Sequence, residues 1–125
     1  MLADRTVVAT VAVKDMGPAK RFYEGVLGLK QVAAEGTQAV TYAAGGGKLL
    51  VYQSQFAGTN KATVATWFVG QDLQRVVQAL KGKGVAFEHY DMPETKREGD
   101  IHTSGPVQAA WFKDPDGNIH AIVNS

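Results

Sequence analysis

The stretch VATVAV at residues 8–13 returns later in the chain as VATWFV at residues 64–69, an offset of 56 residues. Each copy is rich in Val and Thr, which favours a β-strand. A helical pattern follows each copy, and these patterns end at Gly28 and Gly84, which are again 56 residues apart. Such a repeat predicts two halves that share one structural plan.

The first half predicts the order β-α-β-β-β. Residues about 6–14 suit a strand, and Pro18 fits the first turn of a helix, where its missing N–H costs nothing. Gly28 is a natural stop for that helix. Three short strands then follow at residues 31–34, 39–43 and 49–53, with a turn at Gly45-Gly46-Gly47.

The second half predicts the same order. A strand at 63–69 leads into a helix whose apolar residues recur at i, i+3, i+4 and i+7, namely Leu73, Val76, Val77 and Leu80. Further strands are expected at about 85–90, 107–113 and 118–123. Asp114-Pro115-Asp116-Gly117 is a strong turn signal between the last two. We therefore expect one domain over residues 1–125, with module one at about 5–55 and module two at about 62–125.

The segment from Asp91 to Pro106 fits neither a helix nor a strand pattern. It holds two Pro, two Gly and many charged residues. A connection of this length in a small domain is usually a lid or a binding loop. We expect either a lid over a binding site or a surface loop that contacts a neighbouring subunit.

Composition excludes several functional classes. The net charge is +1 with both signs intermixed, so no basic surface for nucleic acid is expected. The absence of cysteine excludes disulfides, thiolate zinc sites and cysteine nucleophiles. No apolar run approaches the roughly 20 residues that span a bilayer. The start of the chain does not resemble a secretory signal, so a cytoplasmic protein without membrane contact is expected.

Two sequence signatures, together with the internal repeat, carry a family resemblance. The first strand ends at Asp15, the aromatic pair Phe22-Tyr23 lies on the helix, and the helix ends at Val26-Leu27-Gly28-Leu29. The run WFKDPDGN at residues 111–118 precedes the final strand. In this order the motifs resemble the vicinal oxygen chelate superfamily, which includes glyoxalase I, bleomycin-resistance proteins and extradiol dioxygenases.

The resemblance implies an α+β fold. Two βαβββ modules form curled mixed sheets around a shared cleft, with helices on the convex faces. Side chains alternate between the faces of a strand. Ala9, Val11 and Val13 are therefore expected to face the helices, and Val8, Thr10 and Ala12 the cleft.

In metal-dependent relatives, His, Glu or Gln side chains on the first and last strand of each module complete the metal site. Spacing from the two motifs, the 56-residue offset, and alignment of the hairpin glycines Gly47 and Gly117 locate the equivalent positions here. These positions are Val8, Val51, Val64 and Ala121. None of these side chains has a donor atom for a divalent ion. We therefore expect no metal and no cofactor.

The expected cleft wall is apolar and aromatic, as in a small-molecule pocket. The ligand-binding residues that we expect are Val8, Thr10, Val51, Gln53, Val64, Thr66, Phe68, Trp111, Ala121 and His102. Ala12, Leu49, Ile119 and Val123 complete the wall. Trp111 and Phe68 are suited to stacking on a flat ligand.

Two functional hypotheses remain open. The first is a metal-free protein that binds a small apolar or aromatic molecule, as bleomycin-resistance proteins do. The second is a lyase, isomerase or dioxygenase that uses other groups, such as Glu88, His89, Asp91 or His102. His120 is expected to be a hydrogen-bonded core histidine. The resemblance also implies a homodimer.

Overall fold

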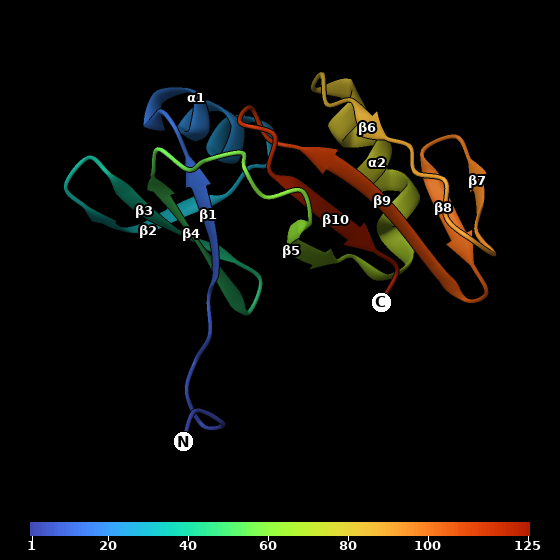
Figure 1. Cartoon of the computed structure of the whole chain (residues 1–125), viewed down its shortest axis with the longest axis horizontal. Helices are drawn as coiled ribbons and strands as arrows, with labels where there is room; N and C mark the ends of the chain where they lie inside the picture. The colour runs from blue at the N-terminus through green and yellow to red at the C-terminus, as the bar shows by residue number, and fades with distance from the viewer. The chain divides into compact units, whose positions relative to one another are not determined.

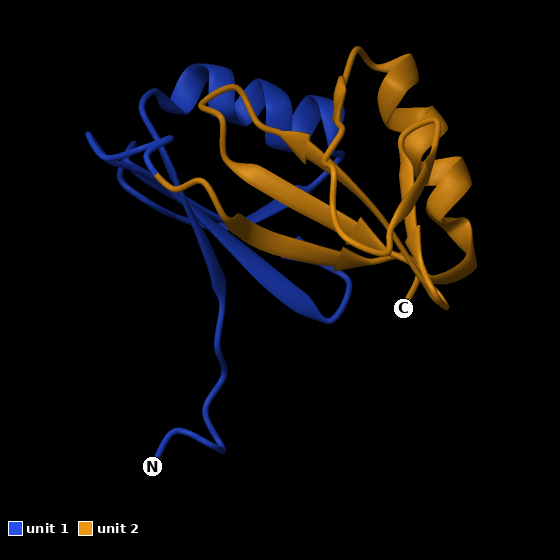
Figure 2. Cartoon of the chain, turned by 45° about the vertical axis from the view of Figure 1, so that its right-hand side comes forward, with its two compact units in different colours: residues 1–59 blue, residues 60–125 orange.

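Each copy of the repeat forms the first strand of its own sheet. The computed structural model describes all 125 residues and divides into unit 1, Met1–Thr59, and unit 2, Asn60–Ser125 (Figure 2). Strand β1 (Ala9–Val13) begins the sheet of unit 1, and β5 (Thr63–Phe68) begins the sheet of unit 2. The predicted α+β fold with two mixed sheets is confirmed.

Unit 1 contains a four-stranded sheet in the order β1-β4-β3-β2 (Figure 1). Its other strands are β2 (Lys30–Glu35), β3 (Ala39–Ala44) and β4 (Gly47–Gln53). β1 runs parallel to β4, and the remaining pairs are antiparallel. This order follows from the βαβββ plan, because the helix after β1 carries the chain across to the far edge of the sheet.

The helix of unit 1 begins as α1 (Met16–Lys20) and continues as the π-helical segment η1 (Arg21–Val26). Asp15 caps the start, since its carboxylate accepts a hydrogen bond from the Gly17 N–H at 3.1 Å. The helix ends with a wide turn in which the Leu27 N–H donates to the Phe22 carbonyl. Gly28 follows with φ 73°, as expected for a glycine that ends a helix.

One face of this sheet forms the core of unit 1. The register pairs Val11 with Val51 and Val51 with Val40, and all three side chains are buried. Tyr23 from the helix stacks on Tyr42 of β3 with ring centroids 6.2 Å apart. The helix therefore covers this face, and the predicted inward orientation of Val11 and Val13 is confirmed.

Unit 2 repeats the plan in the strand order β5-β10-β9-β8-β7. The strands after β5 are β6 (Phe87–Glu88), β7 (Lys96–Glu98), β8 (Ile101–Ser104), β9 (Val107–Lys113) and β10 (Ile119–Val123). The short helix η2 (Gly70–Asp72) leads into α2 (Leu73–Gly82), which lies across one face of the sheet (Figure 1). β5 and β10 are parallel, as β1 and β4 are in unit 1.

The structure corrects the prediction for the segment between α2 and β9. Residues 85–90 form only the two-residue strand β6, which pairs with Trp111 and Phe112 of β9. The position equivalent to β2 belongs to β8, which pairs with Val107–Ala109 at the other end of β9. Much of the expected loop 91–106 is thus the β7–β8 hairpin of the sheet, so the prediction that this segment is irregular was wrong.

The core of unit 2 contains a buried histidine. His120 is 0% exposed, stacks on Phe112 at 5.1 Å, and its Nδ1 accepts a hydrogen bond from the Trp67 indole N–H at 3.0 Å. Desolvation by burial lowers the pKa of His120 to about 4. The expectation of a hydrogen-bonded core histidine is therefore confirmed.

His120 should make the stability of the protein depend on pH. Its pKa is lower in the folded protein than in the unfolded chain, so the unfolded chain binds the proton more readily. The stability is complete above about pH 6.5 and is lost as the pH falls toward 4. From pH 7.5 to 5.0 the wild type should lose about 2 kcal/mol of unfolding free energy through this group. Urea denaturation at the two pH values measures this change in the free energy of unfolding.

His120→Gln provides the control, because its amide oxygen can accept the Trp67 hydrogen bond but does not titrate. The variant should lose about 2 kcal/mol less than the wild type over the same pH interval. Equal losses in the two proteins would contradict the assignment.

Candidate functional site

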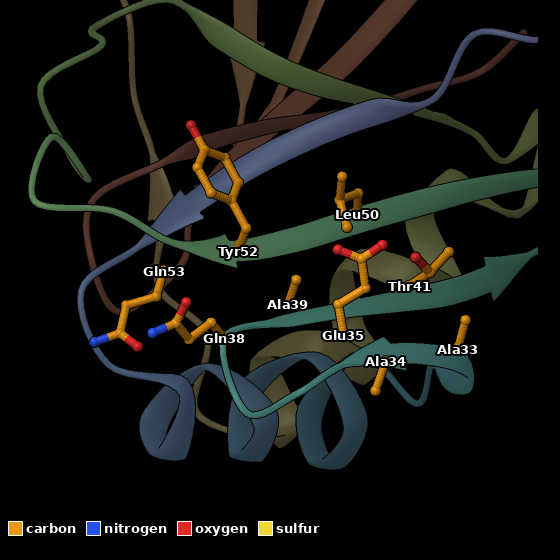
Figure 3. Close-up of a pocket in the computed structure, with 9 residues that line it drawn as sticks. All are labelled: Ala33, Ala34, Glu35, Gln38, Ala39, Thr41, Leu50, Tyr52 and Gln53. Carbon is orange, nitrogen blue, oxygen red and sulfur yellow. The ribbon is translucent and has the colours of Figure 1, made fainter.

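The sheet of unit 1 has one face without a helix, and a pocket lies on this face. Its volume is about 560 Å³ (Figure 3). Nine residues of strands β2, β3 and β4 and the β2–β3 turn line it: Ala33, Ala34, Glu35, Gln38, Ala39, Thr41, Leu50, Tyr52 and Gln53. Apolar and aromatic groups alternate with amide and hydroxyl groups, and Glu35 is the one charged residue. This open pocket therefore offers apolar contact and hydrogen-bonding groups in about equal measure to a small molecule.

The pocket lining includes one of the four predicted ligand-binding residues of unit 1 and lacks the other three. Gln53 lines it, and Thr10 lies on the same helix-free face because the register pairs it with Leu50. Val8 directly precedes β1. Val51, however, is 0% exposed and packs in the core under the helix, so its prediction as a ligand-binding residue was wrong. Leu49 is buried in the same way.

The error at Val51 has a clear origin in the hairpins. In unit 1, Ala44 pairs with Gly47, so Gly47 already belongs to β4. In unit 2, Gly117 lies inside the turn before β10. Aligning these two glycines therefore shifted the register by one residue, which moves every side chain to the other face.

The strand pairing gives the correct equivalence. Thr10 pairs with Leu50 in unit 1, and Thr66, 56 residues after Thr10, pairs with Ala121 in unit 2. Leu50 is therefore the equivalent of Ala121. The position next to it on the helix-free face is Tyr52, which is 38% exposed.

Unit 2 also has a helix-free face, identified by the same pairing. Ala121 pairs with Thr66 and with Trp111, and Val123 pairs with Phe68. Their neighbours His120, Phe112 and Ile122 point to the opposite, buried face. Trp111 is therefore placed away from α2, as its proposed role requires. Phe68 is 72% exposed.

Val64 departs from this regular alternation. Thr63 pairs with Ile119 and Ala65 pairs with His120, so Val64 is an extra residue in a bulge of β5. The 56-residue offset still aligns it with Val8. Its half-buried side chain adds no polar group to the sheet.

Trp111 belongs to an aromatic cluster with Tyr90 and His102. The ring centroid of His102 lies 5.0 Å from that of Trp111, and the centroid of Tyr90 lies 5.4 Å from it, both edge to face. His102 is 2% exposed, and its Nε2 accepts a hydrogen bond from the Tyr90 backbone N–H at 3.0 Å. The sequence prediction included Trp111 and His102 but missed Tyr90, because no periodic pattern marks residues 89–95.

The other polar groups near this cluster form ion pairs. His89 Nε2 lies 2.8 Å from Asp100 Oδ1, and Lys81 Nζ lies 2.7 Å from Asp100 Oδ2. Hydrogen bonds from Lys81 and His89 lower the pKa of Asp100. Glu88 pairs with Lys113 at 3.3 Å. His89 is thus held by Asp100.

The side chains present do not fit a metal ion of the kind that metal-dependent relatives hold. The equivalent strand positions are Val8, Leu50, Val64 and Ala121, which have no donor atoms. No group of three or more His, Asp or Glu side chains in the structure has an arrangement suited to a metal. A carboxylate or imidazole would be needed to replace the water ligands of a divalent ion.

Comparison with known proteins identifies the family. The model of the Glyoxalase/Bleomycin resistance protein/Dioxygenase superfamily matches residues 5–122. No curated protein matches the chain in sequence. None of the helices is long and apolar enough to cross a membrane.

Solved structures share the fold at low sequence identity. An integron cassette protein from the mobile metagenome of Halifax Harbour Sewage Outfall has 16% identity and a TM-score of 0.72, covering 98% of this chain and 99% of that one. Lactoylglutathione lyase from Agrobacterium tumefaciens has 16% identity and a TM-score of 0.70, with coverage of 97% and 94%. The fosfomycin resistance protein FosX from Mesorhizobium loti has 15% identity and a TM-score of 0.68, with coverage of 98% and 92%.

The face assignment in β4 can be tested directly, since the chain contains no cysteine. A thiol in place of Tyr52 should react readily with a maleimide reagent, because this side chain is exposed. A thiol in place of Val51 should react at least about 100-fold more slowly, because it must wait for local opening of the core. Labelling of Tyr52→Cys and Val51→Cys under native conditions, followed by mass spectrometry, measures both rates. Equal rates would disprove the register.

Proposed function

Since the chain belongs to the Glyoxalase/Bleomycin resistance protein/Dioxygenase superfamily, we propose that it binds a small apolar or aromatic molecule without a metal, on the helix-free faces of its sheets. The main support is the pocket of about 560 Å³ on the helix-free face of unit 1. In unit 2, the indole of Trp111 lies on the helix-free face by strand pairing. Flat ligands gain both buried area and ring contacts on such a side chain.

The lack of metal-ligating side chains at the equivalent strand positions of both sheets supports binding rather than metal-assisted chemistry. The strand positions that would supply ligands are occupied by Val, Leu and Ala. The alternative is a lyase, isomerase or dioxygenase that uses Glu88, His89, Asp91 or His102. It has less support, because the structure holds Glu88 with Lys113 and His89 with Asp100. Lactoylglutathione lyase, one of the similar structures, has 16% identity, so the likeness supports the fold and not an activity.

We further propose that the protein is a homodimer. Two phenylalanines support this proposal, because Phe56 is 68% exposed and Phe68 is 72% exposed. Large exposed apolar side chains often belong to protein or ligand contacts. A symmetric interface of roughly 1,200 Å² or more would be typical of a stable dimer.

Trp111→Ala should weaken ligand binding by about 1–3 kcal/mol, because the ligand loses an aromatic contact. The measurement is a titration with aromatic compounds, in which binding is monitored through intrinsic fluorescence and through the melting temperature. Trp67→Phe is the matched control, because Trp67 bonds to His120 on the opposite face of the sheet. The ligand-dependent signal should survive in Trp67→Phe and disappear in Trp111→Phe. A ligand signal that instead follows Trp67 would contradict the proposed site.

Sedimentation velocity at micromolar concentration should report twice the mass of the 13.4 kDa chain. Phe68→Asp should shift the equilibrium toward the monomer if this side chain lies in the interface, because a charge there would be buried without a partner. A wild-type protein that sediments as a monomer would disprove the dimer. The proposal of ligand binding does not depend on that result.

A further inference from the structure

The aromatic cluster of Tyr90, His102 and Trp111 contains two polar atoms without hydrogen-bond partners. These atoms are the hydroxyl of Tyr90 and Nδ1 of His102, and both are buried. Buried polar side-chain atoms in proteins are nearly always satisfied, by the protein, by water or by a ligand. Two such atoms in one cluster of three rings therefore call for a physical explanation.

Both unpaired atoms are hydrogen-bond donors. Nε2 of His102 accepts the Tyr90 backbone N–H, so it carries no proton. The neutral ring must then hold its proton on Nδ1. Burial raises the pKa of the Tyr90 hydroxyl, which therefore stays protonated at neutral pH. The cluster thus holds one O–H group and one N–H group, and neither has a hydrogen-bond acceptor.

The interrupted edge of the sheet explains how this cluster arises. β6 pairs with one end of β9 and β8 with the other, and Tyr90 lies just after β6, outside any strand. The Tyr90 side chain is half-exposed, whereas His102 is 2% exposed. Tyr90 is therefore not held by strand pairing, and a small shift of its ring within the cluster would leave the strand pairs intact.

We propose that Tyr90 and His102 together bind one carbonyl oxygen of a planar aromatic ligand, whose ring packs on Trp111. This inference rests on the proposed function and names the ligand class. A carbonyl oxygen has two lone pairs and can accept from both donors at once. The ligand ring would pack on the part of the half-buried Trp111 indole that Tyr90 and His102 leave uncovered.

The charges around the cluster favour a neutral oxygen over a carboxylate. Lys113 lies on the same strand face as Trp111, but it already pairs with Glu88. Arg97, opposite His102 on β7, donates to the Gly99 carbonyl at 2.7 Å. A buried carboxylate without its own cation would be costly, whereas a ketone or quinone oxygen needs only the two neutral donors.

The test compares 1-indanone with indane, which has the same ring system without the carbonyl. Isothermal titration should show that the wild type binds 1-indanone at least about tenfold more tightly, as expected for new hydrogen bonds to buried donors. Tyr90→Phe and His102→Gln should lose most of this preference and keep their affinity for indane. The glutamine oxygen can still accept the Tyr90 N–H, which protects the fold. The ¹⁵N resonance of His102 Nδ1 should shift only with 1-indanone.

A second measurement needs no ligand. Tyr90→Phe removes an unpaired buried hydroxyl and should raise the melting temperature of the free protein. Tyr42→Phe is the matched control, because the Tyr42 hydroxyl donates to Glu24 at 2.8 Å and its removal should lower the melting temperature. A lower melting temperature in Tyr90→Phe would contradict the premise that the hydroxyl lacks a partner.

The outcomes separate this inference from the proposed function. Equal affinities of the wild type for 1-indanone and indane would overturn the inference and leave aromatic binding intact. Tighter binding of benzoate than of 1-indanone would overturn the choice of a neutral carbonyl. Failure of every aromatic probe to bind the wild type would contradict both proposals.

Discussion

The parallel pairing of the first and last strand in each unit determines which side chains each sheet presents. Thr10 pairs with Leu50, and Thr66 pairs with Ala121. Because side chains alternate along a strand, these pairs also place Val51 and His120 in the two cores. A shift of one residue in either pair would exchange core and surface along the whole strand. The position of the pocket on unit 1 depends on this register.

The two units follow one plan but differ at one edge. In unit 1, β2 pairs continuously with β3 except for a bulge near Val32. In unit 2, the corresponding edge of β9 is shared by β6 and β8, and the chain between them leaves β9 and returns through β7, which pairs with β8. The ion pairs of Asp100 with Lys81 and His89 tie this excursion to α2. Such a break brings Tyr90 and His102 together, which a continuous strand would not do.

The residues that replace metal donors explain why the proposed function differs from that of metal-dependent relatives. Leu50 and Ala121 occupy equivalent positions in the two sheets, and neither side chain has a donor atom. Apolar groups at these positions favour contact with an apolar ligand through the hydrophobic effect. In unit 2, the two buried polar atoms without partners, on Tyr90 and His102, are hydrogen-bond donors rather than metal ligands.

The sequence by itself determined the repeat, the element order within each half and the role of His120, because these features follow from local periodicity and spacing. The fold class and the buried face of β1 followed from the family resemblance together with strand alternation. The sequence also placed Trp111 correctly, since strand alternation beside a strong turn is a local property. Only the tertiary structure decided that Val51 is a core residue, because the hairpin geometry of unit 1 sets the register of β4. It alone showed that residues 96–104 join the sheet and bring Tyr90 to His102. Those contacts depend on pairing with β9, and no local pattern in a polar, glycine-containing segment encodes that pairing.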